Sequence, residues 1–291
     1  MVTDPEPLTG PPLPHPLTGA LHVSPVPPGT GWPDDPADAA TPVAHDADDV
    51  RSLARDADGL AALCGEVSVC RACPRLVAWR EGVAVAKRRA YVAEPYWGRP
   101  IAGWGDERPS LLIVGLAPAV HGGNRTGRVF TGDRSGDWLF ASLHRIGYAS
   151  APTSVHAGDG QRLIGARMVA AVCCAPPGNR PTIGERDTCA PWLLAELAFV
   201  ADSLEVAVCL GSYGWEAAIR AFRAHGYAIP RPRPGFGHAA EAEVDRPGRK
   251  PLLLLGSYHP SQQNTFTRKL TEPMLDAVFE RARRWTEESR G

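Results

Sequence analysis

The sequence predicts an α/β protein in which a central, mainly parallel sheet lies between two layers of helices, a three-layer α/β/α fold. Short apolar segments at 110–115, 166–174, 205–211 and 251–258 alternate with longer segments of helical periodicity. Each short segment is apolar at consecutive positions, which is typical of a parallel strand covered by helices on both faces. The chain has 291 residues, 44% of them hydrophobic, which is enough for one sizeable core.

Residues 1–50 stand apart from this pattern. They contain 12 of the 29 prolines, eight acidic residues and no lysine or arginine. They also lack a helical or strand period, so we expect a disordered or extended arm. Trp32 is the one side chain in it suited to pin the chain to the body. Residues 51–291 are then expected to form a single domain.

The first part of the body is expected to be helical. Residues 49–80 have helical periodicity, with four apolar residues near one face, Leu53, Leu60, Leu63 and Val67. Residues 110–115 (SLLIVG) follow as the first buried strand. Residues 134–147 then form a helix with Ser135 as its N-cap and Gly147 at its end.

The rest of the chain continues the alternation. After the strand at 166–174, the expected elements are a helix at 190–202, a strand at 205–211, a helix at 213–226, a loop at 231–244 leading to an edge strand, and a last core strand at 251–258. A final helix begins near Thr271. Its apolar face carries Leu275, Val278, Phe279, Ala282 and Trp285.

The charge of the body favours a polyanionic partner. The net charge of the chain is −1, but residues 51–291 carry all 31 basic residues against 24 acidic ones. A basic body suits nucleic acid. Of the 31 basic residues only three are lysines, so a bias towards arginine in the genome explains the composition equally well.

The sequence contains neither a membrane span nor a secretion signal. No apolar segment approaches the roughly 20 residues that a membrane span needs. The first ten residues, MVTDPEPLTG, lack the basic and then apolar pattern of a signal peptide. We therefore expect a cytoplasmic protein.

Four of the seven cysteines are spaced like metal ligands. Cys70 and Cys73 form a C-x2-C pair, and Cys174 and Cys189 are separated by 14 residues. In a reducing cytosol this spacing suggests a metal site rather than disulfides. Four thiolates suit either zinc or a 4Fe–4S cluster, and the spacing does not choose between them. A redox C-x2-C pair is less favoured, because the βαβ context of such pairs is missing.

The other three cysteines are expected to be structural. Cys173 alternates with Cys174 on the strand, so that only one of the two faces the loop side, and we assign Cys174 because it is nearer the strand exit. Cys64 falls on the apolar helix stripe and Cys209 within the strand VAVCLG, where each suits a small core side chain.

A glycine-rich segment, residues 115–138, follows the first strand. It lets backbone N–H groups approach a ligand closely. It has neither G-x-G-x-x-G nor a Walker lysine, which disfavours a nucleotide cofactor. It offers the aromatic ring of Phe130 and the carboxylate of Asp133. Taken singly, core packing for Phe130 and helix capping for Asp133 are the commoner roles.

His259 leaves the last core strand directly before Pro260. Ligands in parallel sheets bind outside the carboxyl ends of the strands, and a following proline keeps His259 extended. The imidazole is then aimed at a cleft. Taken alone, a histidine that only caps the turn is the more common case.

These motifs occur in the order found in one known superfamily. GLAPA (115–119), FTGDRSG (130–136), CAPPGN (174–179) and HPS (259–261), with the cysteine quartet, resemble the uracil-DNA glycosylase superfamily. The resemblance is greatest to its iron–sulfur type B branch, family 5, and extends from about Val69 to Met274.

The resemblance implies an enzyme that removes damaged bases from double-stranded DNA. Phe130 would stack on the flipped base, Asp133 would position and activate water, and His259 would hydrogen-bond the base carbonyl. Asn179 would read the base edge. Cys70, Cys73, Cys174 and Cys189 would hold a 4Fe–4S cluster. The remaining candidates for the substrate pocket are Gly115, Leu116, Ala117 and Asn124.

The sequence also departs from the related family 4 pattern. Leu116 stands where those enzymes carry Glu, and Arg268 stands where we expect Gly in the loop that wedges into the duplex. An apolar pocket rejects similar bases poorly. We therefore expect a monomeric glycosylase acting on uracil and also on hypoxanthine. Two other hypotheses remain open, a non-catalytic iron–sulfur DNA-binding module and a metal-dependent hydrolase with Asp133, His121 and His259 as ligands.

Overall fold

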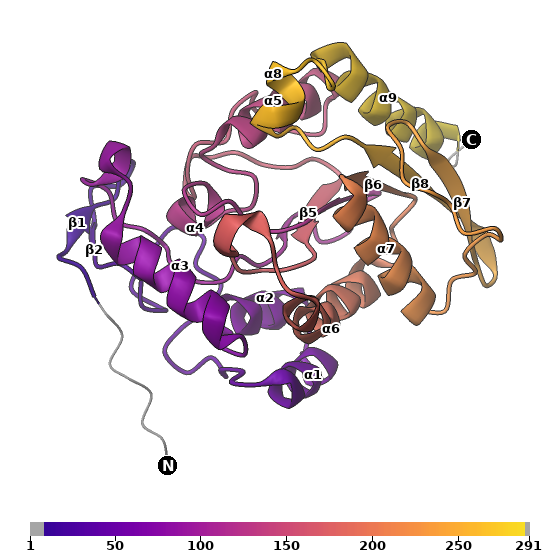
Figure 1. Ribbon diagram of the computed structural model, residues 1–291. Helices are drawn as coiled ribbons and strands as arrows, with labels where there is room; N and C mark the ends of the chain where they lie inside the picture. The colour runs from indigo at the N-terminus through magenta and orange to yellow at the C-terminus, as the bar shows by residue number, and fades with distance from the viewer. Residues whose placement is uncertain (1–8, 289–291) are drawn as a thin grey trace.

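The computed structural model describes residues 9–288 and has a six-stranded sheet at its centre (Figure 1). Its strand order is β3-β5-β4-β6-β8-β7. The four central strands are parallel, and they are β4 (Leu111–Gly115), β5 (Ala166–Ala170), β6 (Val206–Leu210) and β8 (Arg249–Ser257). The edge strands β3 (Trp104–Gly105) and β7 (Glu241–Arg246) are antiparallel to their neighbours.

Helices cover both faces of this sheet, which confirms the three-layer α/β/α prediction. One layer consists of α5 (Arg134–Ile146) and α9 (Glu272–Glu288), and the other of α6 (Ile183–Val200) and α7 (Ser212–Ala224). Leu111 and Ile113 pack in the core cluster that contains α5 and α9, whereas Leu112 and Val114 pack in the one that contains α6 and α7. Successive residues of β4 are therefore buried on opposite faces, as the apolar segment predicted.

Shorter elements complete the described chain. Near the N-terminus lie β1 (Leu13–Pro14), β2 (Leu21–His22), α1 (Ala47–Asp56), α2 (Leu60–Val69), α3 (Pro74–Ala86) and η1 (Arg89–Tyr91). Around the carboxyl ends of the strands lie α4 (Gly123–Thr126), η2 (Pro177–Asn179) and α8 (Gln262–Phe266). Among the residues described, no helix combines the length and the apolar composition that a bilayer span requires.

Two helices begin at other residues than the sequence predicted. The N-cap of α5 is Asp133 rather than Ser135, since the Asp133 side chain accepts the Gly136 amide. Helix α6 begins at Ile183, seven residues before the expected start. Thr182 and Glu185 form a reciprocal capping box there, a signal that the apolar pattern alone does not contain.

The N-terminal segment packs on the body, so the expectation of a disordered or extended arm is wrong for residues 9–50. Trp32 is only 3% exposed, and its ring lies 5.9 Å from that of Trp97. Three buried histidines surround the same indole, namely His15, His22 and His156.

Backbone and charge contacts tie this segment down further. Val26 N donates to Trp97 O at 3.0 Å, and both carboxylate oxygens of Asp35 accept from Arg99 at 2.9 Å. The prolines limit regular structure in this segment, but a few buried side chains, such as Val26 and Trp32, suffice to anchor it.

Candidate active site

The candidate site lies where neighbouring strands send their chains to opposite faces of the sheet. Strand β4 leads through residues 116–133 to α5, whereas its neighbour β6 leads through Gly211 to α7 on the other face. Such a switch point leaves a crevice at the carboxyl ends of the strands, which is the usual binding position in α/β sheets. His259 follows β8 at the same edge.

Phe130 and His259 meet at this edge. Their ring centroids are 5.8 Å apart, and the planes differ by 34°. Phe130 has a positive φ of 50°, a rare conformation for an aromatic residue that often marks a functional site. A Cβ on Gly115 would lie 2.8 Å from Phe130 Cζ, so only glycine allows the ring to lie over the end of β4.

Asp133 is anchored at the start of α5. Its Oδ1 accepts the amide of Gly136 at 3.0 Å, and a Cβ on Gly122 would collide with its Oδ2. Burial raises the pKa of Asp133 above its usual value, although amides of Gly136 and Ser135 and the charge of Arg125 oppose the shift. A carboxylate that is partly desolvated and fixed in direction is a suitable base for a bound water.

His259 is a neutral imidazole near pH 7. Burial lowers its pKa from 6.5 to about 4. The backbone of His259 is held by Asn264, whose Nδ2 donates to the His259 carbonyl at 2.8 Å. Gly211 lies beside it, since a Cβ on that glycine would be 3.6 Å from His259 Cβ. A neutral imidazole with a fixed N–H can donate to a carbonyl oxygen without first losing or gaining a proton.

Two asparagines are further candidates for the pocket. Asn124 is 1% exposed and donates to the Arg80 carbonyl at 3.2 Å. It therefore links α4 to α3 through its Nδ2, while its buried Oδ1 has no partner among the described residues, and its assignment to substrate binding stays a prediction. Asn179 is exposed and has a positive φ of 56°. Its role as a base reader also stays a prediction.

Leu116 and Ala117 contact other parts of the protein. Leu116 lines a groove of about 660 Å³ together with side chains of α1, α6 and α7, among them Leu193 and Ala217. Ala117 packs against Leu76 and Cys174. Leu116 and Ala117 thus face different surroundings. Gly115, the last residue of β4, lies directly under the ring of Phe130.

Two features near the site were missed by the sequence reasoning. A Cβ on Gly214 would lie 2.5 Å from the Val114 carbonyl, so this glycine lets α7 begin directly against the end of β4. On the other side, Phe266 in α8 is 64% exposed, and the guanidinium of Arg134 lies 4.9 Å from its ring centroid. In the sequence, the glycines of GSYG (211–214) and the aromatic Phe266 after HPS could have indicated these two features.

Five cysteines line a second, small cavity. Cys70 ends α2, Cys73 caps α3, and Cys189 lies within α6, while Cys173 and Cys174 follow β5. Because β5 already ends at Ala170, the strand alternation expected for Cys173 and Cys174 does not apply, and both reach the cavity. All seven cysteines are free thiols.

The electrostatics of this cavity disfavour free thiolates. Burial raises the pKa of Cys70, Cys73 and Cys174, and the mutual repulsion of the thiolates adds to the effect. For Cys189 the pKa is lowered, chiefly because the Cys173 thiol hydrogen-bonds to its sulfur. Thiolates that are this poorly solvated need a cationic group to be stable.

The other cysteines and candidate ligands are placed as follows. Cys209 is fully buried in β6, as expected. The surroundings of Cys64 are more polar than predicted, because Arg167 Nη2 donates to its sulfur at 3.3 Å. Within residues 9–288, no three or more His, Cys, Asp or Glu side chains converge on a position for a single metal ion, and Asp133, His121 and His259 form no such group.

Comparison with known proteins defines the class of this fold and site. Residues 102–283 match the model of the Uracil DNA glycosylase superfamily, and this range contains Phe130, Asp133 and His259. The chain is 55% identical over 270 residues to type-5 uracil-DNA glycosylases of Mycobacterium bovis and Mycobacterium tuberculosis, covering 93% of this chain and 98% of each relative. A type-5 uracil-DNA glycosylase of Thermus thermophilus is 46% identical over 218 residues, or 75% of this chain and 94% of that protein. The chain belongs to the uracil-DNA glycosylase superfamily and, within it, to the type-5 family.

Proposed function

We propose that this protein hydrolyses the N-glycosidic bond of uracil in double-stranded DNA and that hypoxanthine is a second substrate. The observation that carries the proposal is the pairing of the Phe130 and His259 rings beside the anchored carboxylate of Asp133. Together these groups offer a stacking surface, a hydrogen-bond donor and a base for water, which are the functions that base excision requires.

The target base must first leave the duplex. Flipping it out of the stack costs a few kcal/mol, and the cost is least for a mispaired base. Stacking on an aromatic side chain returns roughly 1–3 kcal/mol. Phe130 is suited to this function because the backbone at φ 50° and the absence of a side chain at Gly115 fix its ring at the crevice.

Bond cleavage then leaves negative charge on the departing base and positive charge on the sugar. The neutral imidazole of His259 can donate to a carbonyl oxygen of the base and stabilise the developing negative charge. Asp133 can orient a water towards the sugar carbon, take its proton, and oppose the positive charge. The raised pKa of Asp133 makes it a stronger base than an exposed aspartate.

The polar groups around Phe130 support a broad base specificity. His259 needs only a carbonyl acceptor, which uracil and hypoxanthine share. The side-chain amide of Asn124, another candidate for the pocket, already donates to the Arg80 carbonyl. Binding the larger purine would then leave few buried polar groups of the pocket without a hydrogen-bond partner. Such unpaired groups are the main source of discrimination between bases.

The surface next to the site suits a DNA duplex. Phe266 is an exposed aromatic side chain close in sequence to His259, and Arg134 directly follows Asp133. The Lys269 ammonium lies 4.7 Å from the Tyr258 ring centroid. We propose that Phe266 enters the space left by the flipped base, while Arg134 and Lys269 contact phosphates.

We further propose that the cysteine cavity holds a 4Fe–4S cluster, with Cys70, Cys73, Cys174 and Cys189 as ligands. The donor set fits, since four thiols from three segments line one cavity, and the raised pKa values of Cys70, Cys73 and Cys174 call for a cationic partner. When bound, a cluster would supply the covalent link that joins α2 and α3 to α6. Zinc is the alternative with the same ligands, but no three Cys, His, Asp or Glu side chains of residues 9–288 converge on one ion position, which favours the larger cluster.

One assay tests the proposed activity against the two other hypotheses. The purified protein is incubated with U:G, U:A, hypoxanthine:T and undamaged duplexes, and abasic sites are then revealed by alkali cleavage. We expect cleavage at uracil and hypoxanthine, with and without EDTA. Failure to form abasic sites on every duplex would favour a non-catalytic DNA-binding module, and loss of activity with EDTA would favour a metal-dependent hydrolase.

A further inference from the structure

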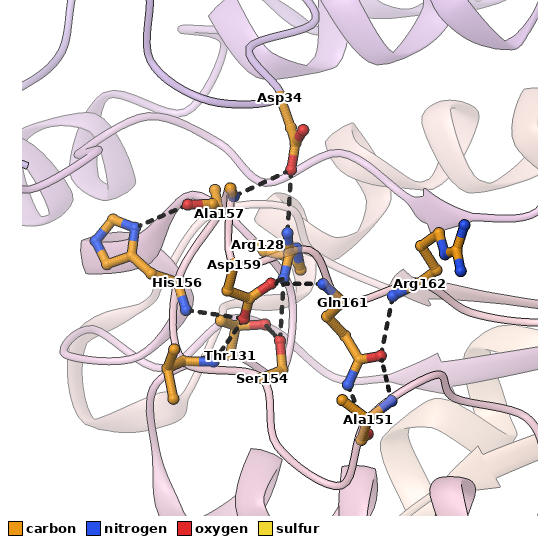
Figure 2. Close-up of polar contacts among 12 residues, drawn as sticks. Asp34, Arg128, Thr131, Ala151, Ser154, His156, Ala157, Asp159, Gln161 and Arg162 are labelled. Atoms are coloured by element: carbon orange, nitrogen blue, oxygen red, sulfur yellow. Dashed lines mark hydrogen bonds and ion pairs between the residues drawn. The ribbon is translucent and has the colours of Figure 1, made fainter. Parts of the chain in front are cut away.

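The loop that carries Phe130 and Asp133 is held by a buried arginine two residues before Phe130. The Arg128 side chain is 3% exposed, and Figure 2 shows its guanidinium between two carboxylates. Nη1 donates to Asp159 at 2.6 Å, and Nη2 donates to Asp34 at 3.0 Å. The guanidinium also lies 4.5 Å from the Trp104 ring centroid. A charge buried this deeply requires such partners, which fixes the position of the loop.

The loop at 151–161 also holds the loop that carries Phe130. It contacts Arg128 before this residue and Thr131 and Gly132 after it. Thr131 Oγ1 and Ser154 Oγ are 2.8 Å apart, and the Gly132 amide donates to the Ser154 carbonyl at 3.0 Å. Asp159 is itself oriented, because it accepts the amides of Val155 and Gln161 at 2.9 Å. Although burial raises the pKa of Asp159, hydrogen bonds from Arg128 and Gln161 outweigh this effect and lower it.

The other carboxylate comes from the N-terminal segment. Asp34 Oδ2 accepts from Arg128 and also from the Gly158 amide, at 3.3 Å, so it joins the two loops. Trp32, two residues earlier, lies against the glycine that precedes Arg128, since a Cβ on Gly127 would be 2.7 Å from the indole Nε1. The N-terminal segment thus contacts the loop at two successive positions.

We propose that Arg128 and Asp34 are positioning residues, through which the N-terminal segment holds Phe130 and Asp133 in place for the flipped base. The proposal rests on the proposed excision activity. Phe130 keeps a positive φ, a conformation that persists in an aromatic residue only when its surroundings enforce it. The clamp formed by Asp34, Arg128 and Asp159 provides that enforcement directly beside it.

The variant Asp34→Asn tests the clamp without endangering the fold. The Asp34 side chain is 55% exposed, and its positive φ of 58° is one that asparagine also tolerates. Asp187→Asn is the matched control, because the Asp187 carboxylate is 50% exposed and accepts from Arg220 at 2.8 Å, away from the loop. We expect faster amide hydrogen exchange in residues 127–133 for Asp34→Asn. We also expect a single-turnover rate lowered about two- to fivefold, since Asp34 itself is largely exposed and Asp159 still pairs with Arg128. The control should match the wild type in both measurements.

A double-mutant cycle separates positioning from general stability. If Asp34 acts through the Phe130 ring, its effect on the rate should shrink in a Phe130→Ala background. Arg128→Lys should resemble Asp34→Asn, because a single ammonium cannot bridge two carboxylates in the same way. Unchanged exchange and rate for Asp34→Asn, or an undiminished loss in the Phe130→Ala background, would overturn the proposal. An inactive wild-type protein would contradict the excision activity instead, and the exchange comparison would still decide whether the clamp exists.

Discussion

The guanidinium of Arg75 donates to both carboxylate oxygens of Glu185, from Nε at 2.7 Å and from Nη2 at 2.6 Å. Arg75 lies two residues after Cys73 in α3, and Glu185 lies four residues before Cys189 in α6. This bidentate pair therefore joins the two helices that carry Cys73 and Cys189, two of the four proposed cluster ligands. The Arg75 bonds also lower the pKa of Glu185, outweighing the opposite effect of burial.

The first prediction concerns the cluster. Protein purified without oxygen should be brown, with broad visible absorbance and about four irons per chain. Cys70→Ser should lose colour and iron, whereas Cys64→Ser and Cys173→Ser should keep both, because neither residue belongs to the proposed ligand set. Colourless protein that contains stoichiometric zinc would replace the cluster with the alternative metal.

The second prediction concerns Asp133. Asp133→Asn should lower the single-turnover rate about a hundredfold or more, the usual contribution of a general base. DNA affinity should change little, since the proposed function of Asp133 lies in the transition state. Asparagine can still accept the Gly136 amide, so the helix cap is retained. A rate close to that of the wild type would assign water activation to another residue.

The third prediction concerns stability at low pH. Burial lowers the pKa of His15 to about 4, with help from the charge of His22, and burial lowers that of His156 to about 3. In the unfolded chain these histidines take up protons near their usual pKa of 6.5, whereas in the folded protein they stay neutral until about pH 4 or below. The contribution of these neutral histidines to stability should therefore be fully present above pH 6.5, the pKa in the unfolded chain. It should decrease as the pH falls towards 4.

Thermal melts across this pH range measure the effect. His156→Asn should give a shallower fall of the melting temperature with decreasing pH, because one group that takes up a proton on unfolding is gone. An equally steep fall in the variant would place the acid sensitivity elsewhere in the protein.

The fourth prediction concerns the N-terminal segment. Deletion of residues 1–40 should lower the melting temperature and the excision rate, since it removes Trp32 from its contact with Trp97 and Asp34 from Arg128. Loss of a buried aromatic side chain alone typically costs about 3–5 kcal/mol. A truncated protein as stable and active as the full chain would show that the segment only covers the body.

The N-terminal segment also shows where sequence reasoning ends. The strand at 110–115 was predictable because burial on both faces makes every position apolar, a pattern that depends only on neighbours in the chain. The packing of Trp32 depends on His156 and Trp97, which are distant in sequence, and the prolines conceal it by removing any period. Composition therefore indicated an irregular segment and a Trp32 anchor, but it did not predict how much of the segment packs on the body.

The candidate site shows a similar division. Phe130, Asp133 and His259 could be proposed because short motifs at strand ends meet at one edge of a parallel sheet. The contact of Asn124 with Arg80 and the place of Leu116 in the groove beside α6 could not, because both depend on residues that are distant along the chain. The clamp on Arg128 was equally hidden, since its two carboxylates lie 94 and 31 residues away along the chain.

The last prediction concerns specificity. We expect excision of uracil and hypoxanthine, with uracil opposite guanine removed faster than uracil opposite adenine. Phe130 stacks on any aromatic base and therefore adds affinity without choosing among bases. The neutral His259 requires a carbonyl acceptor, which both bases present, so the preference should come from the cost of extrusion, which is lower at a mismatch. Single-turnover rates on U:G, U:A and hypoxanthine:T duplexes of one sequence context measure this preference. Activity on uracil alone would show that a base reader such as Asn179 controls the pocket, and equal U:G and U:A rates would show that extrusion does not limit the reaction.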